Sequence, residues 1–94
     1  NGRQALEVAR REQPQLILLD IIMPELDGIE TCRLLKQGED TRHIPVIMVT
    51  TKGMQHMVAA AYGAGCDDFV TKPVDKGELV RKIQIHGPRR EAAL

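Results

Sequence analysis

Short aliphatic runs alternate along the chain with longer segments in which apolar residues recur every three or four positions. Residues 15–20 and 46–49 contain unbroken aliphatic runs, which predict strands that are buried on both faces. Residues 68–71 predict a third short strand. Because strands that alternate with helices form parallel sheets with right-handed crossovers, the pattern predicts an α/β domain.

Four segments have the spacing and the end signals of helices. The first covers residues 2–13 and is followed by Pro14, and the third covers residues 54–62. The second and fourth open with an aspartate that is followed three residues later by a glutamate, which is the spacing of a capping box. These pairs are Asp27 with Glu30 and Asp75 with Glu78.

The second and fourth helices each carry a predicted apolar stripe that should face a core. Glycines at positions 38 and 87 are expected to end these helices. The predicted stripes consist of Ile29, Cys32 and Leu35 in the second helix and of Leu79, Val80 and Ile83 in the fourth.

Polar side chains stand at the carboxyl ends of the three predicted strands, namely Asp20, Thr50 and Lys72. Sites in open parallel sheets form at these ends, so we expect the three side chains to converge. A carboxylate can attack phosphorus and become an acyl phosphate. A hydroxyl and an ammonium group suit the charge that spreads over a transferred phosphoryl group. The sequence therefore favours phosphoryl transfer to Asp20.

Composition disfavours several other classes of function. The 94 residues include 13 basic and 13 acidic side chains, and aromatic residues make up only 2%. A nucleic-acid surface usually needs a basic excess and base stacking needs aromatic rings, so neither is expected. The aliphatic run at residues 16–19 is far too short to cross a bilayer. Cys32 and Cys66 form no paired motif, which favours packing roles in a reduced, cytoplasmic chain.

In register, the motifs resemble those of the response-regulator receiver family of two-component signalling systems. Residues 20–28, DIIMPELDG, resemble the family's phosphorylation loop, D-x-x-M-P-x-x-D-G. Residues 45–50, PVIMVT, resemble the strand that ends in the switch threonine. Residues 63–73, GAGCDDFVTKP, resemble the last strand with its Lys-Pro pair, and residues 1–6 resemble the start of the second helix.

The resemblance implies a phosphoacceptor signalling domain rather than an enzyme with an outside substrate. Asp20 would accept the phosphoryl group from a sensor histidine kinase, and Thr50 and Lys72 would contact that group. The other implied roles are Thr51 as a neighbour of the phosphoryl group, Phe69 as the aromatic that switches with Thr50, Ile22 as a backbone-carbonyl ligand of Mg²⁺ beside Asp20, Pro73 in a cis peptide bond, and Gly28 as a structural glycine.

The implied fold is a doubly wound, flavodoxin-like receiver fold that lacks its first two strands and first helix. Residues 1–88 would form a partial receiver domain, and residues 89–94 a tail or the start of a linker to an output domain. The family's acidic pair belongs to the lacking part, so Mg²⁺ is expected to bind this chain weakly or not at all. The strand at residues 16–19 would become a sheet edge, and the lacking first helix would leave apolar sheet surface uncovered. The chain is therefore expected to form a homodimer or exchange elements through this strand, to aggregate, or to exist only as the ordered part of a longer chain.

Two other functions compete with this interpretation. Aspartyl-phosphate phosphatases of the haloacid-dehalogenase type also place a nucleophilic aspartate after a buried strand. Their motif at this place resembles D-x-D-G-[TV], and in this chain Ile22 stands where that motif requires the second aspartate. The other competitor is a receiver-like fragment that is not phosphorylated and acts as an interaction or dimerisation module. Magnesium-dependent phosphate uptake would separate this module from a phosphoacceptor.

Overall fold

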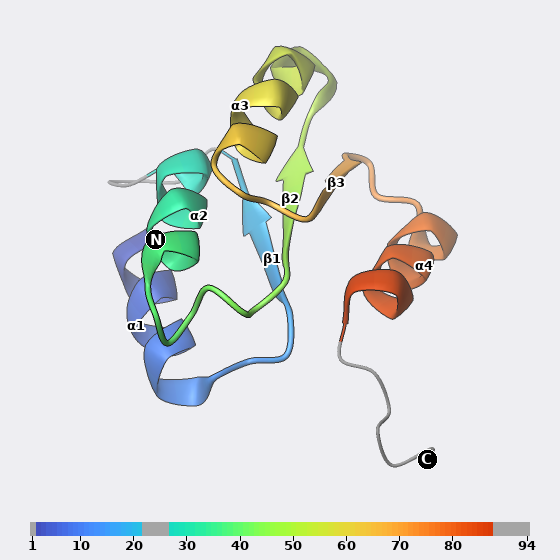
Figure 1. The fold of residues 1–94 in the computed structure, drawn as a ribbon. Coiled ribbons are helices and arrows are strands. Elements are labelled where there is room, and N and C mark those ends of the chain that lie inside the picture. Colours follow the sequence, from blue (N-terminus) through green and yellow to red (C-terminus); the bar gives the residue numbers. More distant parts are fainter. Residues whose placement is uncertain (1, 22–26, 88–94) are drawn as a thin grey trace.

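A parallel sheet of three strands forms the centre of the computed structural model, which describes residues 2–21 and 27–87 (Figure 1). The strands β1 (Ile17–Asp20), β2 (Val46–Thr50) and β3 (Asp68–Thr71) stand side by side in this order. Both neighbouring pairs are parallel. The predicted α/β architecture is therefore confirmed.

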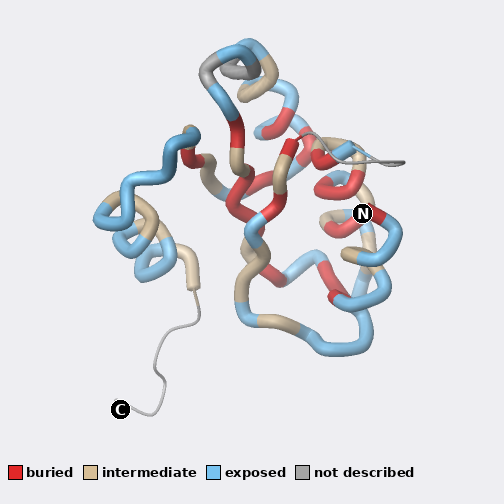
Figure 2. The backbone as a smooth tube through the Cα atoms, turned by 180° about the vertical axis from the view of Figure 1, so that it is seen from behind, coloured by how far each residue is buried: buried red, intermediate tan, exposed pale blue. Residues whose placement is uncertain are grey.

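Helices lie on both sides of this sheet. They are α1 (Gly2–Glu12), α2 (Gly28–Gln37), α3 (Val58–Gly63) and α4 (Lys76–His86). Seen from the front and from behind, the sheet lies between α1 and α2 on one side and α4 on the other (Figures 1 and 2). None of these helices combines the length and the apolar composition that a membrane span requires.

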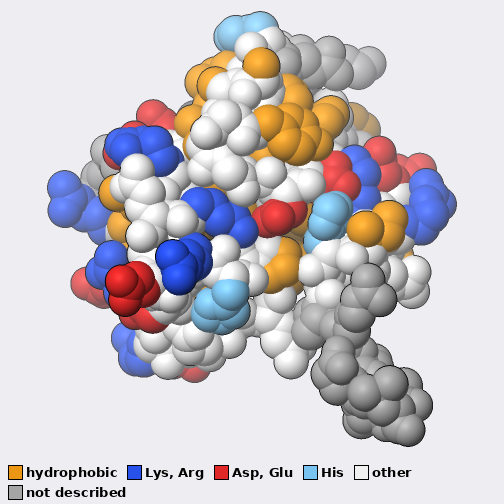
Figure 3. Space-filling model, viewed as in Figure 1, with side chains coloured by type: hydrophobic (Ala, Val, Ile, Leu, Met, Phe, Trp, Pro, Cys, Tyr) orange, Lys and Arg blue, Asp and Glu red, His pale blue; other side chains and the backbone are white. Residues whose placement is uncertain are grey.

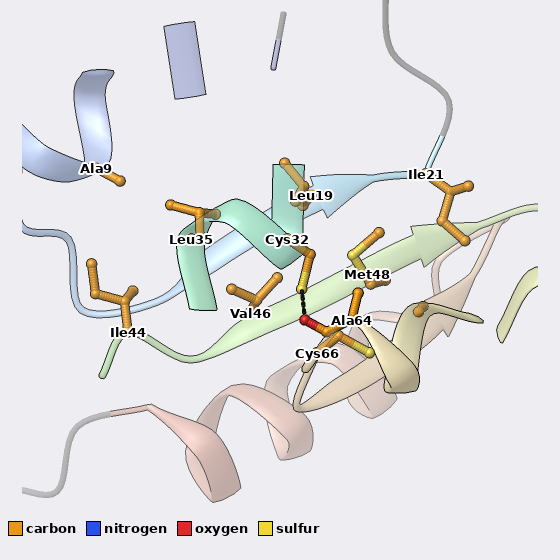
Figure 4. Close-up of a cluster of buried hydrophobic side chains, with 11 residues drawn as sticks. Ala9, Leu19, Ile21, Cys32, Leu35, Ile44, Val46, Met48, Ala64 and Cys66 are labelled. Atoms are coloured by element: carbon orange, nitrogen blue, oxygen red, sulfur yellow. Dashed lines mark hydrogen bonds between the residues drawn. The ribbon is translucent and has the colours of Figure 1, made fainter. Parts of the chain in front are cut away.

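The main core lies between the sheet and the helices α1, α2 and α3. Alternate strand residues such as Leu19, Val46 and Met48 point to this side, because successive side chains of a strand face opposite ways. The full cluster, most of which is labelled in Figure 4, comprises Ala9, Leu19, Ile21, Cys32, Leu35, Ile44, Val46, Met48, Ala61, Ala64 and Cys66. Ile47 and Val70 are buried outside this cluster, on the other face of the sheet.

Helix α2 shows how the sequence sets its ends. The side chain of Asp27 accepts a hydrogen bond from the backbone N–H of Glu30 at 2.7 Å, as expected of an N-cap. The reciprocal half of the capping box is not formed, because the Glu30 carboxylate pairs with Arg33 instead. Gly38 ends the helix, and its N–H donates to the carbonyl of Leu34.

Two predictions about buried surfaces were wrong. The strand β1 is covered on one face only, since Leu19 is buried whereas Leu18 is 47% exposed. The reason is that no described helix packs closely against this second face. Helix α4 has no buried residue, and Val80 and Ile83 of its predicted stripe are 50% and 37% exposed.

The third helix also differs from its prediction. Residues Lys52–Met57 form a 3₁₀ helix, and only Val58–Gly63 are α-helical. Met57 stands at the N-cap and has no side chain that bonds to the first turn.

Candidate functional site

Asp20 and Lys72 meet at the carboxyl edge of the sheet. Asp20 is the last residue of β1, and Lys72 follows the last residue of β3. The ammonium Nζ of Lys72 lies 2.8 Å from Oδ2 of Asp20 and donates a hydrogen bond to it. The two side chains are 49% and 42% exposed, so a small molecule in solvent can reach both.

Thr50 ends the central strand between these two residues, but its hydroxyl is turned to its own neighbour. It is buried, and its Oγ1 donates to the carbonyl oxygen of Thr51 at 3.2 Å. The Thr50 carbonyl accepts a hydrogen bond from the N–H of Lys72, which fixes the start of the Lys72 segment against β2. Thr51 is exposed. The structure therefore brings Asp20 and Lys72 together directly and places Thr50 on the strand between them.

Gly28, the first residue of α2, lies close against the backbone of Asp20 and Ile21. Its N–H donates to the carbonyl of Ile21 at 2.7 Å. A Cβ atom at this position would lie only 1.9 Å from the carbonyl oxygen of Asp20. Only glycine fits this approach without a backbone shift, so the predicted structural role of Gly28 has a steric cause.

The peptide bond between Lys72 and Pro73 is cis, the geometry that the family resemblance implies. Ile22, the predicted carbonyl ligand of Mg²⁺, lies outside the described residues, as do residues 89–94 of the predicted tail. Both remain predictions.

The described residues do not form a magnesium site by themselves. Mg²⁺ prefers near-octahedral oxygen coordination that includes carboxylates. Across residues 2–21 and 27–87, no group of three or more histidine, cysteine or acidic side chains could hold a metal ion. Asp67 and Asp68 lie at the opposite end of β3 from Lys72, where Asp67 accepts from the N–H of Val46 and pairs with Lys36. The donor set around Asp20 therefore does not fit the ion on the described residues alone.

Phe69, the predicted switch aromatic, has partners that the sequence motifs did not indicate. The ring packs partly against the main core and meets Tyr62 of α3 edge to face, with centroids 6.1 Å apart. The Nζ atom of Lys82, on α4, lies 5.0 Å from the Phe69 ring centroid. The only sequence signal for Lys82 is its i,i+4 spacing from Glu78, which predicts an ion pair between them and no contact with a strand.

The cysteines pack in the core, as predicted. Cys32 Sγ lies 3.8 Å from the carbonyl oxygen of Ala64 (Figure 4). Burial raises the pKa of Cys32 to about 11 and that of Cys66 to about 12. Both thiols are therefore protonated at neutral pH, which suits packing and not nucleophilic chemistry.

The sequence matches a known protein family. The sequence model of the family described as "Response regulator receiver domain" matches residues 1–84. The polar-differentiation response regulator DivK of Brucella anthropi is 38% identical over 86 residues, which are 92% of this chain and 70% of DivK.

Solved structures agree with the family match. The signal receiver domain of a signal transduction histidine kinase from Syntrophus aciditrophicus is 39% identical, with a TM-score of 0.80 over 90% of this chain and 64% of that one. The receiver domain of the sensor histidine kinase PA1611 from Pseudomonas aeruginosa is 32% identical, with a TM-score of 0.82 over 92% of this chain and 70% of that one. The latter structure has a magnesium ion coordinated in its active-site cleft.

Proposed function

The chain belongs to the response-regulator receiver domain family, and on that premise we propose that Asp20 is its phosphoacceptor. The observation that carries the proposal is the contact between Asp20 and Lys72 at the carboxyl edge of the sheet. A carboxylate oxygen of Asp20 attacks the phosphorus of a phosphodonor, and the bond from phosphorus to the donor's leaving group breaks. The product is an acyl phosphate on Asp20.

Lys72 is the residue that we propose to neutralise the negative charge before and after phosphoryl transfer. Before transfer its ammonium group pairs with the single negative charge of Asp20. A half-exposed pair of this kind contributes only about 0–1 kcal/mol, so little holds Lys72 in this position. After transfer the negative charge resides on the phosphoryl oxygens, and Lys72 can follow it as a mobile point charge.

Thr50 supplies the hydroxyl of the proposed switch. In the described conformation this hydroxyl bonds to the Thr51 carbonyl, an interaction that a rotation of the side chain breaks. A phosphoryl oxygen on Asp20 is a stronger, charged acceptor than a carbonyl. We propose that Thr50 turns to it and that the Phe69 ring moves in response.

A sensor histidine kinase is the proposed phosphodonor, and a C-terminal output domain or a separate protein is the proposed target. Two of the similar structures are themselves receiver domains of histidine kinases. We place the reaction in the cytoplasm. The predicted division into a receiver unit at 1–88 and a tail at 89–94 is part of this proposal.

Phosphate labelling tests the assignment. The chain and a version preceded by a receiver first strand with its acidic pair are incubated with Mg²⁺ and a small phosphodonor such as acetyl phosphate. We expect an acid-stable, base-labile label on the extended version, which Asp20→Ala abolishes. Asp40→Ala is the matched control, because Asp40 lies exposed in the turn after α2.

The outcomes separate the candidate functions. An undiminished label on the Asp20→Ala variant contradicts the assignment of the phosphoacceptor. No label on either version would favour the interaction module that is not phosphorylated. Label on the extended version alone is the expected result.

A further inference from the structure

Ion pairs and hydrogen bonds of charged side chains link α4 to the sheet. Asp68, the first residue of β3, lies 3.2 Å from Nζ of Lys82 and 2.9 Å from Nε2 of His86. Glu78 approaches Lys82 from one helical turn earlier, at 3.6 Å. Figure 3 shows acidic, basic and histidine side chains side by side over this part of the molecule. Helix α4 buries no residue of its own, so these contacts are among those that hold it against β3.

Lys82 is the centre of this group and also its link to the other face of the sheet. Its ammonium group donates to the backbone carbonyl of Phe69 and lies near the Phe69 ring. The ring belongs to the side of α1–α3, where it packs against the main core, while Lys82 comes from α4 on the opposite side. Lys82 therefore reaches around the edge of β3 and contacts both layers.

The burial of Lys82 makes this position specific. Its side chain is largely covered, as is that of Asp68, so the ammonium group is held away from bulk water. A cation near an aromatic face is attracted by the ring quadrupole, more strongly when it is partly desolvated. Tyr62 contacts the same ring through an edge-to-face pair. The Phe69 ring is thus held by a cation from α4 and an aromatic ring from α3.

We propose that Lys82 is a positioning residue that couples the place of the Phe69 ring to the docking of α4. When the ring leaves its position, Lys82 loses the cation–π contact, and α4 loses part of its attachment to β3. Conversely, a partner that pulls α4 away from β3 frees the ring. The proposal rests on the proposed function in one respect, namely that phosphorylation of Asp20 causes the Phe69 ring to move.

The chain offers a clean readout, because it contains one phenylalanine and one tyrosine. Isotope labels on these two residue types report only Phe69 and Tyr62. Three-bond couplings of Phe69 give the population of its side-chain rotamers, and ring-to-ring cross-peaks report the contact with Tyr62. The measurement uses the unphosphorylated chain, so its outcome does not depend on whether Asp20 accepts phosphate.

The variant Lys82→Leu removes the charge and keeps an aliphatic stem. We expect the population ratio of the described rotamer to the alternatives to fall about threefold, the size that loss of a partly covered cation–π contact implies. The cross-peak with Tyr62 should weaken in parallel. Lys76→Leu, the same substitution at an exposed position of the same helix, should change neither signal. Lys82→Arg retains the cation and should preserve the ring position.

A purely structural role for Lys82 predicts a different result. In that case Lys82→Leu accelerates amide exchange in α4 and leaves the Phe69 couplings as they are in Lys76→Leu, which would overturn the proposal. If Lys82→Leu does not fold, Lys82→Gln replaces it, because this change removes the charge and keeps a long polar side chain. Unchanged ring couplings in a folded Lys82→Gln chain would also overturn the proposal.

Discussion

The two faces of the sheet are covered by helices that begin with the same signal but attach in different ways. Both α2 and α4 start at an aspartate whose side chain accepts from the N–H of a glutamate three residues on. Helix α2 buries four of its residues, whereas α4 buries none. Local signals therefore decide where a helix begins, and the surface available to the helix decides what it buries.

The surfaces on the two sides explain the contrast. On the α2 side, α1 and α3 add further apolar neighbours, and one continuous cluster forms. On the α4 side, Leu18 of the sheet is exposed to solvent. Helix α4 contacts β3 through ion pairs. Apolar burial contributes roughly 25 cal/mol per Å², whereas a largely covered ion pair loses part of its Coulombic gain to the desolvation of its two charges. The α4 side should therefore be the weaker one.

The largest effect should come from removing core atoms on the α2 side. Leu35→Ala in α2 leaves a cavity in the main cluster, because Leu35 is fully buried. We expect a loss of about 2–5 kcal/mol in the free energy of unfolding, measured by urea denaturation. Val80→Ala in α4 is the counterpart on the other side and should change this free energy by less than about 0.5 kcal/mol. Equal losses would mean that the two sides are packed alike.

This contrast also marks how far the sequence could predict the structure. The order of elements, the parallel sheet and the two Asp caps followed from local patterns, and so did the meeting of Asp20 with Lys72. These features depend on residues close in sequence or on the rule that strand ends share an edge.

The exposure of the α4 stripe could not be predicted in the same way. Periodicity shows that a residue has an apolar face, and it does not show whether another element covers that face. The contacts of Lys82 with Asp68 and Phe69 escaped prediction because they join residues with no common motif. Such contacts depend on how α4 is placed across the edge of β3.

The second prediction concerns the edge strand β1 and its exposed residue Leu18. The edge strand β1 has no strand on its outer side among the described residues, and Leu18 is exposed beside that edge. Because an unpaired edge can pair with another chain, the 94-residue polypeptide should self-associate at micromolar concentrations. Sedimentation velocity over a concentration series measures this association.

A charge on the edge should weaken the association. Leu18→Lys should shift the polypeptide towards the monomer, while Val8→Lys, a similar change at an exposed residue of α1, should not. A wild-type chain that sediments as a monomer at every concentration and unfolds cooperatively would refute the prediction. It would also show that the two faces differ less than their exposed residues indicate.

The two caps provide a smaller and more selective comparison. Asp27→Ala and Asp75→Ala each remove one side-chain acceptor from a helix start, a change that costs about 1 kcal/mol. In α2 the loss should appear in global unfolding, because this helix is part of the main core. In α4 it should appear chiefly as faster amide exchange of residues 76–86, because a weakly attached helix can open by itself. Identical exchange patterns in the two variants would contradict this difference.

The smallest expected effect is a dependence of the α4 attachment on pH through Asp68. Burial alone would raise the pKa of this carboxyl, but hydrogen bonds from the Phe69 N–H, His86 and Lys82 outweigh burial and hold the pKa below its usual range. The unfolded chain therefore binds the proton more readily, and stability falls as the pH decreases. The contribution is complete above the ordinary aspartate pKa of about 3.9 and is lost as the pH falls through the folded-state value.

A comparison of the wild-type chain with Asp68→Asn isolates the contribution of the Asp68 charge to stability. Tyr62, Glu78, Lys82 and His86 surround the carboxyl in both chains, and the measured quantity is the difference between the two unfolding free energies. That difference should shrink as the pH falls below about 5, since protonation of Asp68 removes the charge that asparagine always lacks. A difference that does not change with pH would mean that the charge of Asp68 does not help to hold α4 against β3.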